Sequence, residues 1–68
     1  MSKEIDDRQG KAVASLYLGK LQRGKLRREQ CEEEIKQKLE KEGYSRGSIL
    51  GVLLEFNHLV DKHGVYKW

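Results

Sequence analysis

One stretch decides the fold that the sequence predicts: YSRGSILGVLLEFNHLVDKHGV, residues 44–65. Ser45 is a residue type that caps the start of a helix, and Gly64 is one that ends a helix, so a helix is predicted between them. Its apolar residues recur at helical spacing, because Ile49, Leu53, Phe56 and Val60 share one face with His63, and Val52 and Leu59 lie at the border. This pattern indicates the central helix of the fold.

Two further helices are predicted before it, and each is ended by a glycine that tolerates the left-handed conformation. The first covers residues 8–23 and ends at Gly24, and the second covers residues 28–42 and ends at Gly43. The expected apolar stripes are Val13, Leu16, Tyr17 and Leu21 on the first helix, and Cys31, Ile35 and Leu39 on the second. The sequence therefore predicts an all-α, small three-helix domain with the third helix as its central spine.

Length and composition limit what such a domain contains. The 68 residues make one small domain at most, and 37% are hydrophobic and 37% charged, with a net charge of +3. Residues 1–7 are mostly charged, so we expect a flexible N-terminal arm before a single domain over residues 8–68. A core this small contributes only ~3–5 kcal/mol without disulfides or metals. Compact packing, self-association or a partner is therefore needed.

Catalytic and metal-binding patterns are absent from the sequence. It has no phosphate loop, dinucleotide fingerprint or nucleophile elbow, and His58 and His63 lie five residues apart, on different sides of a helix. Cys31 lies on an apolar stripe, which predicts a buried structural thiol, although nearby Arg27 and Arg28 leave a reactive thiol as the alternative. We therefore predict that the chain is not an enzyme, and that it has no metal, cofactor or small-molecule substrate.

Positive charge gathers at the turn between the first two helices, with no acidic residue from 19 to 28. With the free amides of the second helix, these side chains are suited to phosphate groups, which favours nucleic-acid binding as one function. The alternative is a solvated turn whose positive charges balance the negative charges of the glutamates that follow it. A net charge of +3 gives little long-range electrostatic steering of a nucleic acid toward the chain. We call the following residues the basic corner: Lys20, Arg23, Lys25, Arg27 and Arg28.

The third predicted helix also has a second apolar side. Leu50 and Leu54 lie four residues apart and roughly 100° from the main stripe. Two alternatives follow for these leucines. Either the other two helices cover them, or they form an exposed patch that binds a partner or a second copy of the chain. Gly47 and Gly51 lie on one face as well. They allow a close helix approach, or they reflect a loose first turn in which Ser48 is the cap.

The chain ends with two aromatic residues that fold back over the core or anchor a partner. The main functional prediction is a small non-enzymatic regulatory or adaptor protein that binds a protein partner, with a symmetric dimer as one form of this binding. The expected partner-binding residues are Leu50, Leu54, Gly47, Gly51, Tyr66 and Trp68.

Two motifs in the second half of the chain support a comparison with a known family. Residues 33–45 read EEIKQKLEKEGYS, and they are followed by the apolar periodicity of Ile49, Val52, Leu53 and Phe56 and by the closing residues 63–65. With these motifs, residues 28–65 resemble a single helical repeat of the RecX recombination-regulator family. The resemblance implies a helical module that docks on a protein–DNA filament, and it implies no functional residue.

Neither the N-terminus nor any internal run predicts membrane insertion. No run of about 18 apolar residues is present, and the charged N-terminus lacks the apolar region of a secretory signal. A single cysteine is typical of a reducing compartment, so we expect a cytoplasmic protein without membrane contact.

Overall fold

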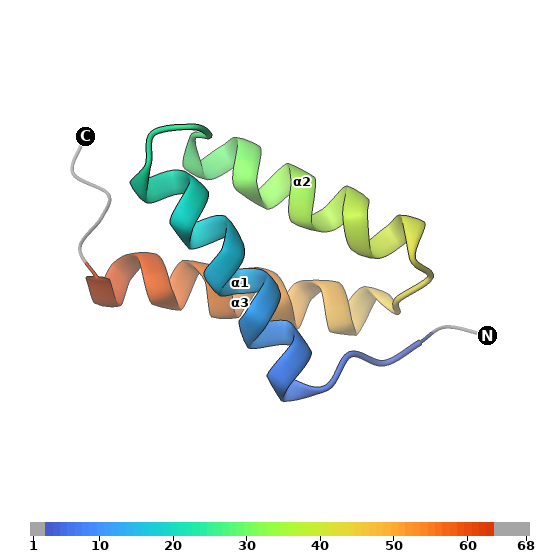
Figure 1. The fold of residues 1–68 in the computed structure, drawn as a ribbon. Helices are drawn as coiled ribbons and strands as arrows, with labels where there is room; N and C mark the ends of the chain where they lie inside the picture. The colour runs from blue at the N-terminus through green and yellow to red at the C-terminus, as the bar shows by residue number, and fades with distance from the viewer. Residues whose placement is uncertain (1–2, 64–68) are drawn as a thin grey trace.

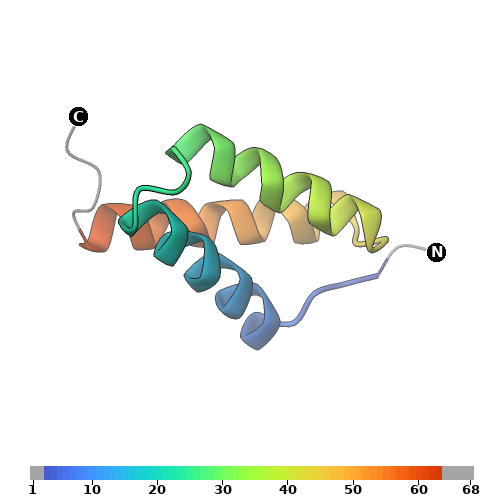
Figure 2. The same ribbon diagram turned by 45° about the horizontal axis from the view of Figure 1, so that its top comes forward.

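The structure is a computed structural model, and it describes residues 3–63. It contains three helices, α1 (Asp7–Gln22), α2 (Arg28–Lys41) and α3 (Arg46–His63). In Figure 1, α1 crosses over α3 while α2 lies along another side of it, and Figure 2 shows the same arrangement from a second direction. The predicted all-α, three-helix fold with the third helix as its spine is confirmed.

Both internal helix ends follow the expected glycine chemistry. Gly24 and Gly43 have φ values of 74° and 87°, in the left-handed region that favours glycine. After Gly43, the Tyr44 amide donates a hydrogen bond of 3.0 Å to the Leu39 carbonyl, and the Gly24 end has an equivalent bond. These are Schellman ends, and they confirm the predicted stops. Gly64, the predicted third stop, lies outside the described residues.

The starts of α2 and α3 also form as the sequence predicts. The Gln30 side chain accepts a hydrogen bond of 2.9 Å from the Arg27 amide, which is half of a capping box. The Ser45 hydroxyl accepts one of 3.2 Å from the Ser48 amide, and α3 begins at Arg46. Ser45 is therefore the cap, and the alternative of a loose first turn capped by Ser48 is wrong.

The core lies where the three helices meet. Phe56 of α3 is fully buried, and the cluster of buried residues to which it belongs contains side chains of all three helices. On α3 the buried face is centred on Val52, which was expected at its border, whereas Leu53 is half-buried and His63 is exposed. The buried apolar residues are Ala14, Tyr17, Leu18, Leu21, Cys31, Ile35, Leu39, Ile49, Val52, Phe56 and Val60.

The buried face of α1 differs from the predicted stripe. Leu16 was expected in the core, but its exposed fraction is 53%. The core instead takes Ala14 and Leu18, which continue a row that starts at buried Gly10. Gly10 at the start of this row packs against α3, where an added Cβ would lie 3.5 Å from the Val52 Cγ2, an ordinary contact distance. The buried face of α1 is therefore rotated relative to the predicted stripe, with Leu18 inside and Leu16 outside.

The segment before α1 packs against the body of the molecule from residue 3 onward. The main chain of Lys3 exchanges two hydrogen bonds, of 2.7 and 2.9 Å, with the turn between α2 and α3. The Ile5 amide donates one of 3.0 Å to the Ser48 hydroxyl, and the Ile5 side chain packs on the core. A flexible arm was expected over residues 1–7, but residues 3–6 are held because their polar groups find partners.

Candidate protein-interaction surface

One face of α3 is left uncovered by the rest of residues 3–63. The helices α1 and α2 occupy neighbouring sides of α3, and no helix lies on the remaining side (Figures 1 and 2). Leu50 and Leu54 lie on that side with exposed fractions of 58% and 73%. The alternative in which the other two helices cover both leucines is therefore wrong.

Gly47 and Gly51 lie beside the two leucines on the same side of α3. A Cβ added to either glycine would meet no atom within 4 Å, so α1 and α2 do not use them for close packing. Each glycine lowers helix propensity by ~1 kcal/mol relative to alanine, and within residues 3–63 no contact offsets that cost. We call Gly47, Leu50, Gly51 and Leu54 the open face.

A groove of about 260 Å³ borders the open face, where the start of α1 meets α3. Both glycines of the open face line it, and so does Lys11. The Glu4 carboxylate is held there by a hydrogen bond of 3.2 Å from the Ser48 hydroxyl. Four carboxylate side chains, which we call the acidic rim, also line the groove: Glu4, Asp6, Asp7 and Glu55.

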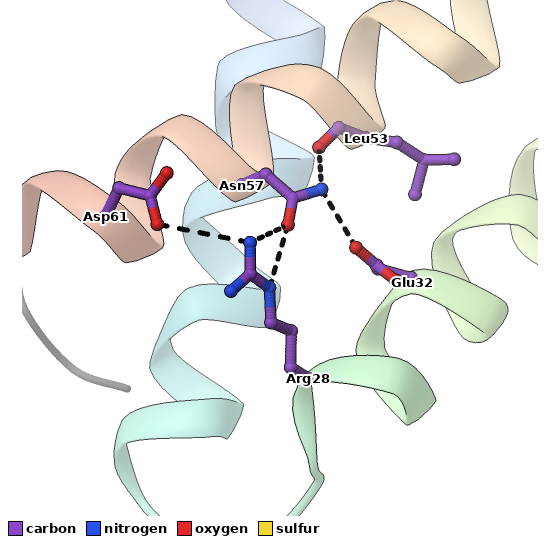
Figure 3. A network of polar contacts seen from close by, with 5 residues as sticks. All are labelled: Arg28, Glu32, Leu53, Asn57 and Asp61. Atoms are coloured by element: carbon purple, nitrogen blue, oxygen red, sulfur yellow. Dashed lines mark hydrogen bonds and ion pairs between the residues drawn. The ribbon is translucent and has the colours of Figure 1, made fainter. Parts of the chain in front are cut away.

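A polar network lies on the opposite flank of the open face (Figure 3). The Asn57 amide oxygen accepts a hydrogen bond of 2.8 Å from the Arg28 Nε and a second one from its Nη2. The Asn57 amide nitrogen donates bonds of 2.9 Å to Glu32 and to the Leu53 carbonyl. Arg28 also lies 4.0 Å from the Asp61 carboxylate. The network fastens the first turn of α2 to α3.

Sequence reasoning did not identify this network. A signal for it is present, because Arg28 and Glu32 share one face of α2 and Asn57 and Asp61 share one face of α3. Spacing within each helix cannot show that the two faces meet.

The structure divides the basic corner. Arg23, Lys25 and Arg27 are exposed together at the turn between α1 and α2. The Lys20 nitrogen instead lies 4.9 Å from the centre of a tyrosine ring on the same helix, and Arg28 is turned toward α3. Three of the five cations therefore form one exposed cluster.

Cys31 is buried, as predicted. Its exposed fraction is 0%, and its Sγ lies 3.6 Å from the Tyr17 carbonyl oxygen. Burial raises the pKa of the Cys31 thiol, and the Glu34 carboxylate raises it further. A reactive cysteine needs a lowered pKa and access to solvent, so the geometry of Cys31 is that of a structural thiol.

The other candidate groups lie apart from one another. Within residues 3–63, no three histidine, cysteine or carboxylate side chains gather as metal ligands. No helix of these residues has the length and apolar character needed to cross a membrane. Tyr66 and Trp68, the remaining predicted partner-binding residues, lie outside the described residues.

Comparison of the chain with protein-family models, curated proteins and solved structures finds no match. The resemblance of residues 28–65 to a RecX repeat therefore stays a prediction, and the surface of the chain itself supplies the grounds for a function.

Proposed function

We propose that this chain is a small non-enzymatic regulatory or adaptor protein of the cytoplasm, which binds a helix of a protein partner on the open face of α3. The observation that carries the proposal is the exposure of Leu50 and Leu54 next to two glycines that leave the helix backbone bare. Full burial of a leucine contributes ~1.5–3 kcal/mol, so two leucines give a partner a substantial part of its binding free energy.

The spacing on the open face favours a helical partner. Gly47, Leu50, Gly51 and Leu54 follow one another as i, i+3, i+4 and i+7, the pattern by which helices dock on helices. Glycines allow two helix backbones to approach closely, and leucines beside them fill the space on either side. The RecX resemblance of residues 28–65 implies the same kind of role, a helical module that docks on another assembly.

Site-specific photo-crosslinking in the native host tests this proposal. A photoreactive phenylalanine derivative at position 54 is expected to form a protein adduct, because a docked helix covers that side chain. The matched control is position 16, where Leu16 is also exposed but lies on α1. Adducts of equal yield at both positions, or none at position 54, would contradict the proposal.

Nucleic-acid binding through phosphate contacts is the second candidate function. The observation that favours it is the exposed cluster of Arg23, Lys25 and Arg27 at one turn. No aromatic side chain interleaves these cations in the sequence, so the expected contacts position the chain on the phosphates without reading bases.

A further inference from the structure

Residues 3–5 bind the body of the molecule in the manner of an extended peptide, and we call them the strap. The Lys3 amide donates a hydrogen bond of 2.9 Å to the Gly43 carbonyl, and the Lys3 carbonyl accepts one of 2.7 Å from the Ser45 amide. These two bonds form a parallel β-bridge to Tyr44, whose ring centre also lies 4.8 Å from the Lys3 Nζ. The turn between α2 and α3 therefore holds the strap as it would hold an added β-strand.

The rest of the strap makes its contacts with α3. The Ile5 amide donates a hydrogen bond of 3.0 Å to the Ser48 hydroxyl, which itself donates one of 3.2 Å to the Glu4 carboxylate. The Ile5 side chain is half-buried and packs on the core, whereas the side chains of Lys3 and Glu4 are exposed. Ile5 is therefore the apolar anchor of the strap.

We propose that the strap is a built-in ligand that leaves its site as a unit while the three helices stay folded, and that the vacated site binds an extended peptide of another protein. The peptide has the chemistry of the strap. It carries a cationic residue for the Tyr44 ring, main-chain groups for the turn, and an aliphatic residue two places later for the position of Ile5. The inference goes beyond the proposed function, because it does not depend on a helix that binds the open face.

The neighbours of the strap keep their own partners when it leaves. The start of α1 stays capped, because the Asp6 carboxylate accepts a hydrogen bond of 2.7 Å from the Gln9 amide. The Ser48 hydroxyl keeps the hydrogen bond of 3.0 Å that the Ser45 hydroxyl donates to it. Opening therefore removes one half-buried side chain and a few hydrogen bonds, and segments with so few buried contacts open far more often than a core does.

Amide hydrogen exchange of the full chain, followed by NMR, tests the opening. The Ile5 and Ser45 amides lie forty residues apart in the sequence, and each loses its hydrogen bond when the strap leaves. They should therefore share one protection factor, at least tenfold below that of the Phe56 amide in the core. Unrelated protection factors at the two positions, or values equal to that of Phe56, would overturn the proposal.

Two variants separate the opening of the strap from the unfolding of the chain. Ile5→Ser removes the anchor and should lower the protection of the Ser45 amide by about fivefold, as expected for a half-buried aliphatic side chain. Val13→Ser is the matched control, because Val13 is also half-buried against the core but lies on α1. It weakens the open and closed forms alike, so it should lower the protection of Phe56 and leave that of Ser45 unchanged. Equal effects of the two variants on Ser45 would overturn the proposal.

A synthetic peptide of residues 2–8 with blocked ends tests the vacated site. In the isotope-labelled Ile5→Ser chain it should shift the NMR signals of Tyr44 and Ser45, with a dissociation constant on the order of 1 mM. The wild-type chain should bind it about fivefold more weakly, because its own strap occupies the site. The same peptide with Ile5→Asp is the control and should cause no shift. Equal shifts from the two peptides, or none from either in the Ile5→Ser chain, would overturn the proposal.

The outcomes are independent of crosslinking at position 54. If the strap opens and the peptide binds while position 54 forms no adduct, this inference stands and the proposed function is overturned. The reverse result overturns this inference alone.

Discussion

At the scale of single residues, burial and neighbours decide what a side chain does. Arg28 belongs to the basic corner by sequence, yet its guanidinium group donates a hydrogen bond to the Asn57 side chain of α3. Cys31 stands near the start of a helix, a place that activates thiols, yet its burial reverses the effect on its pKa. Neither residue is available for the role that its position in the sequence would permit.

The buried thiol leads to a prediction about alkaline pH. Burial, aided by Glu34, raises the pKa of Cys31 in the folded state, so the unfolded chain releases this proton first as pH rises. The contribution to stability is complete below the pKa of the unfolded thiol and is lost as pH rises toward the folded value. We expect the free energy of unfolding, measured by urea titration, to fall as pH rises through about 9.

Cys31→Ala is the control for this prediction. Alanine leaves a small cavity and lowers stability at every pH, but it should make the alkaline fall shallower. The remaining fall comes from Tyr17, whose pKa is also raised, chiefly by burial. An identical alkaline slope in the wild type and the variant would refute the role of the thiol.

At the scale of elements, glycines act differently inside a helix and at its end. Gly19 lies in α1, where a Cβ would meet no atom within 4 Å, whereas Gly24 ends that helix with a φ of 74°. The first position suits any residue that favours helix, and the second suits glycine because a Cβ is strained there.

The two positions therefore predict opposite effects of one substitution. Gly19→Ala should stabilise the fold by ~1 kcal/mol through helix propensity. Gly24→Ala should destabilise it by ~1–2 kcal/mol because alanine strains the left-handed turn. Urea unfolding of both variants measures the difference, and shifts of the same sign would contradict the helix end described here.

At the scale of the whole molecule, opposite charges lie near opposite ends of α1. The acidic rim surrounds its start, and the exposed cations of the basic corner follow its end. The open face of α3 is bordered by the acidic rim, so a protein partner and a nucleic acid would use different parts of the surface. The two candidate functions can therefore be tested by separate variants.

Charge reversal tests the nucleic-acid candidate. If the chain binds DNA or RNA, the triple variant Arg23→Glu, Lys25→Glu and Arg27→Glu should remove binding equally for all sequences, because phosphate contacts do not specify bases. Lys36→Glu, an exposed reversal on α2, is the control and should have a small effect. Fluorescence anisotropy with a labelled oligonucleotide measures both. Unchanged affinity in the triple variant would exclude the basic corner.

The sequence by itself determined the number of helices, their order and their ends to within a residue or two. Caps such as Ser45 and glycines such as Gly43 act through bonds to residues only a few positions away, so a local pattern is enough to predict them. The burial of Ile35 and Phe56 follows from the same helical periodicity.

Only the tertiary structure decided which apolar residues face inward and which surface stays free. Leu16 and Leu18 are equally apolar, yet the packing of α1 on the other helices places only Leu18 in the core. The same packing leaves Leu50 and Leu54 exposed, because two helices cover only two sides of a third. Crossing angles and neighbours depend on contacts far apart in the chain, and helical periodicity carries no information about them.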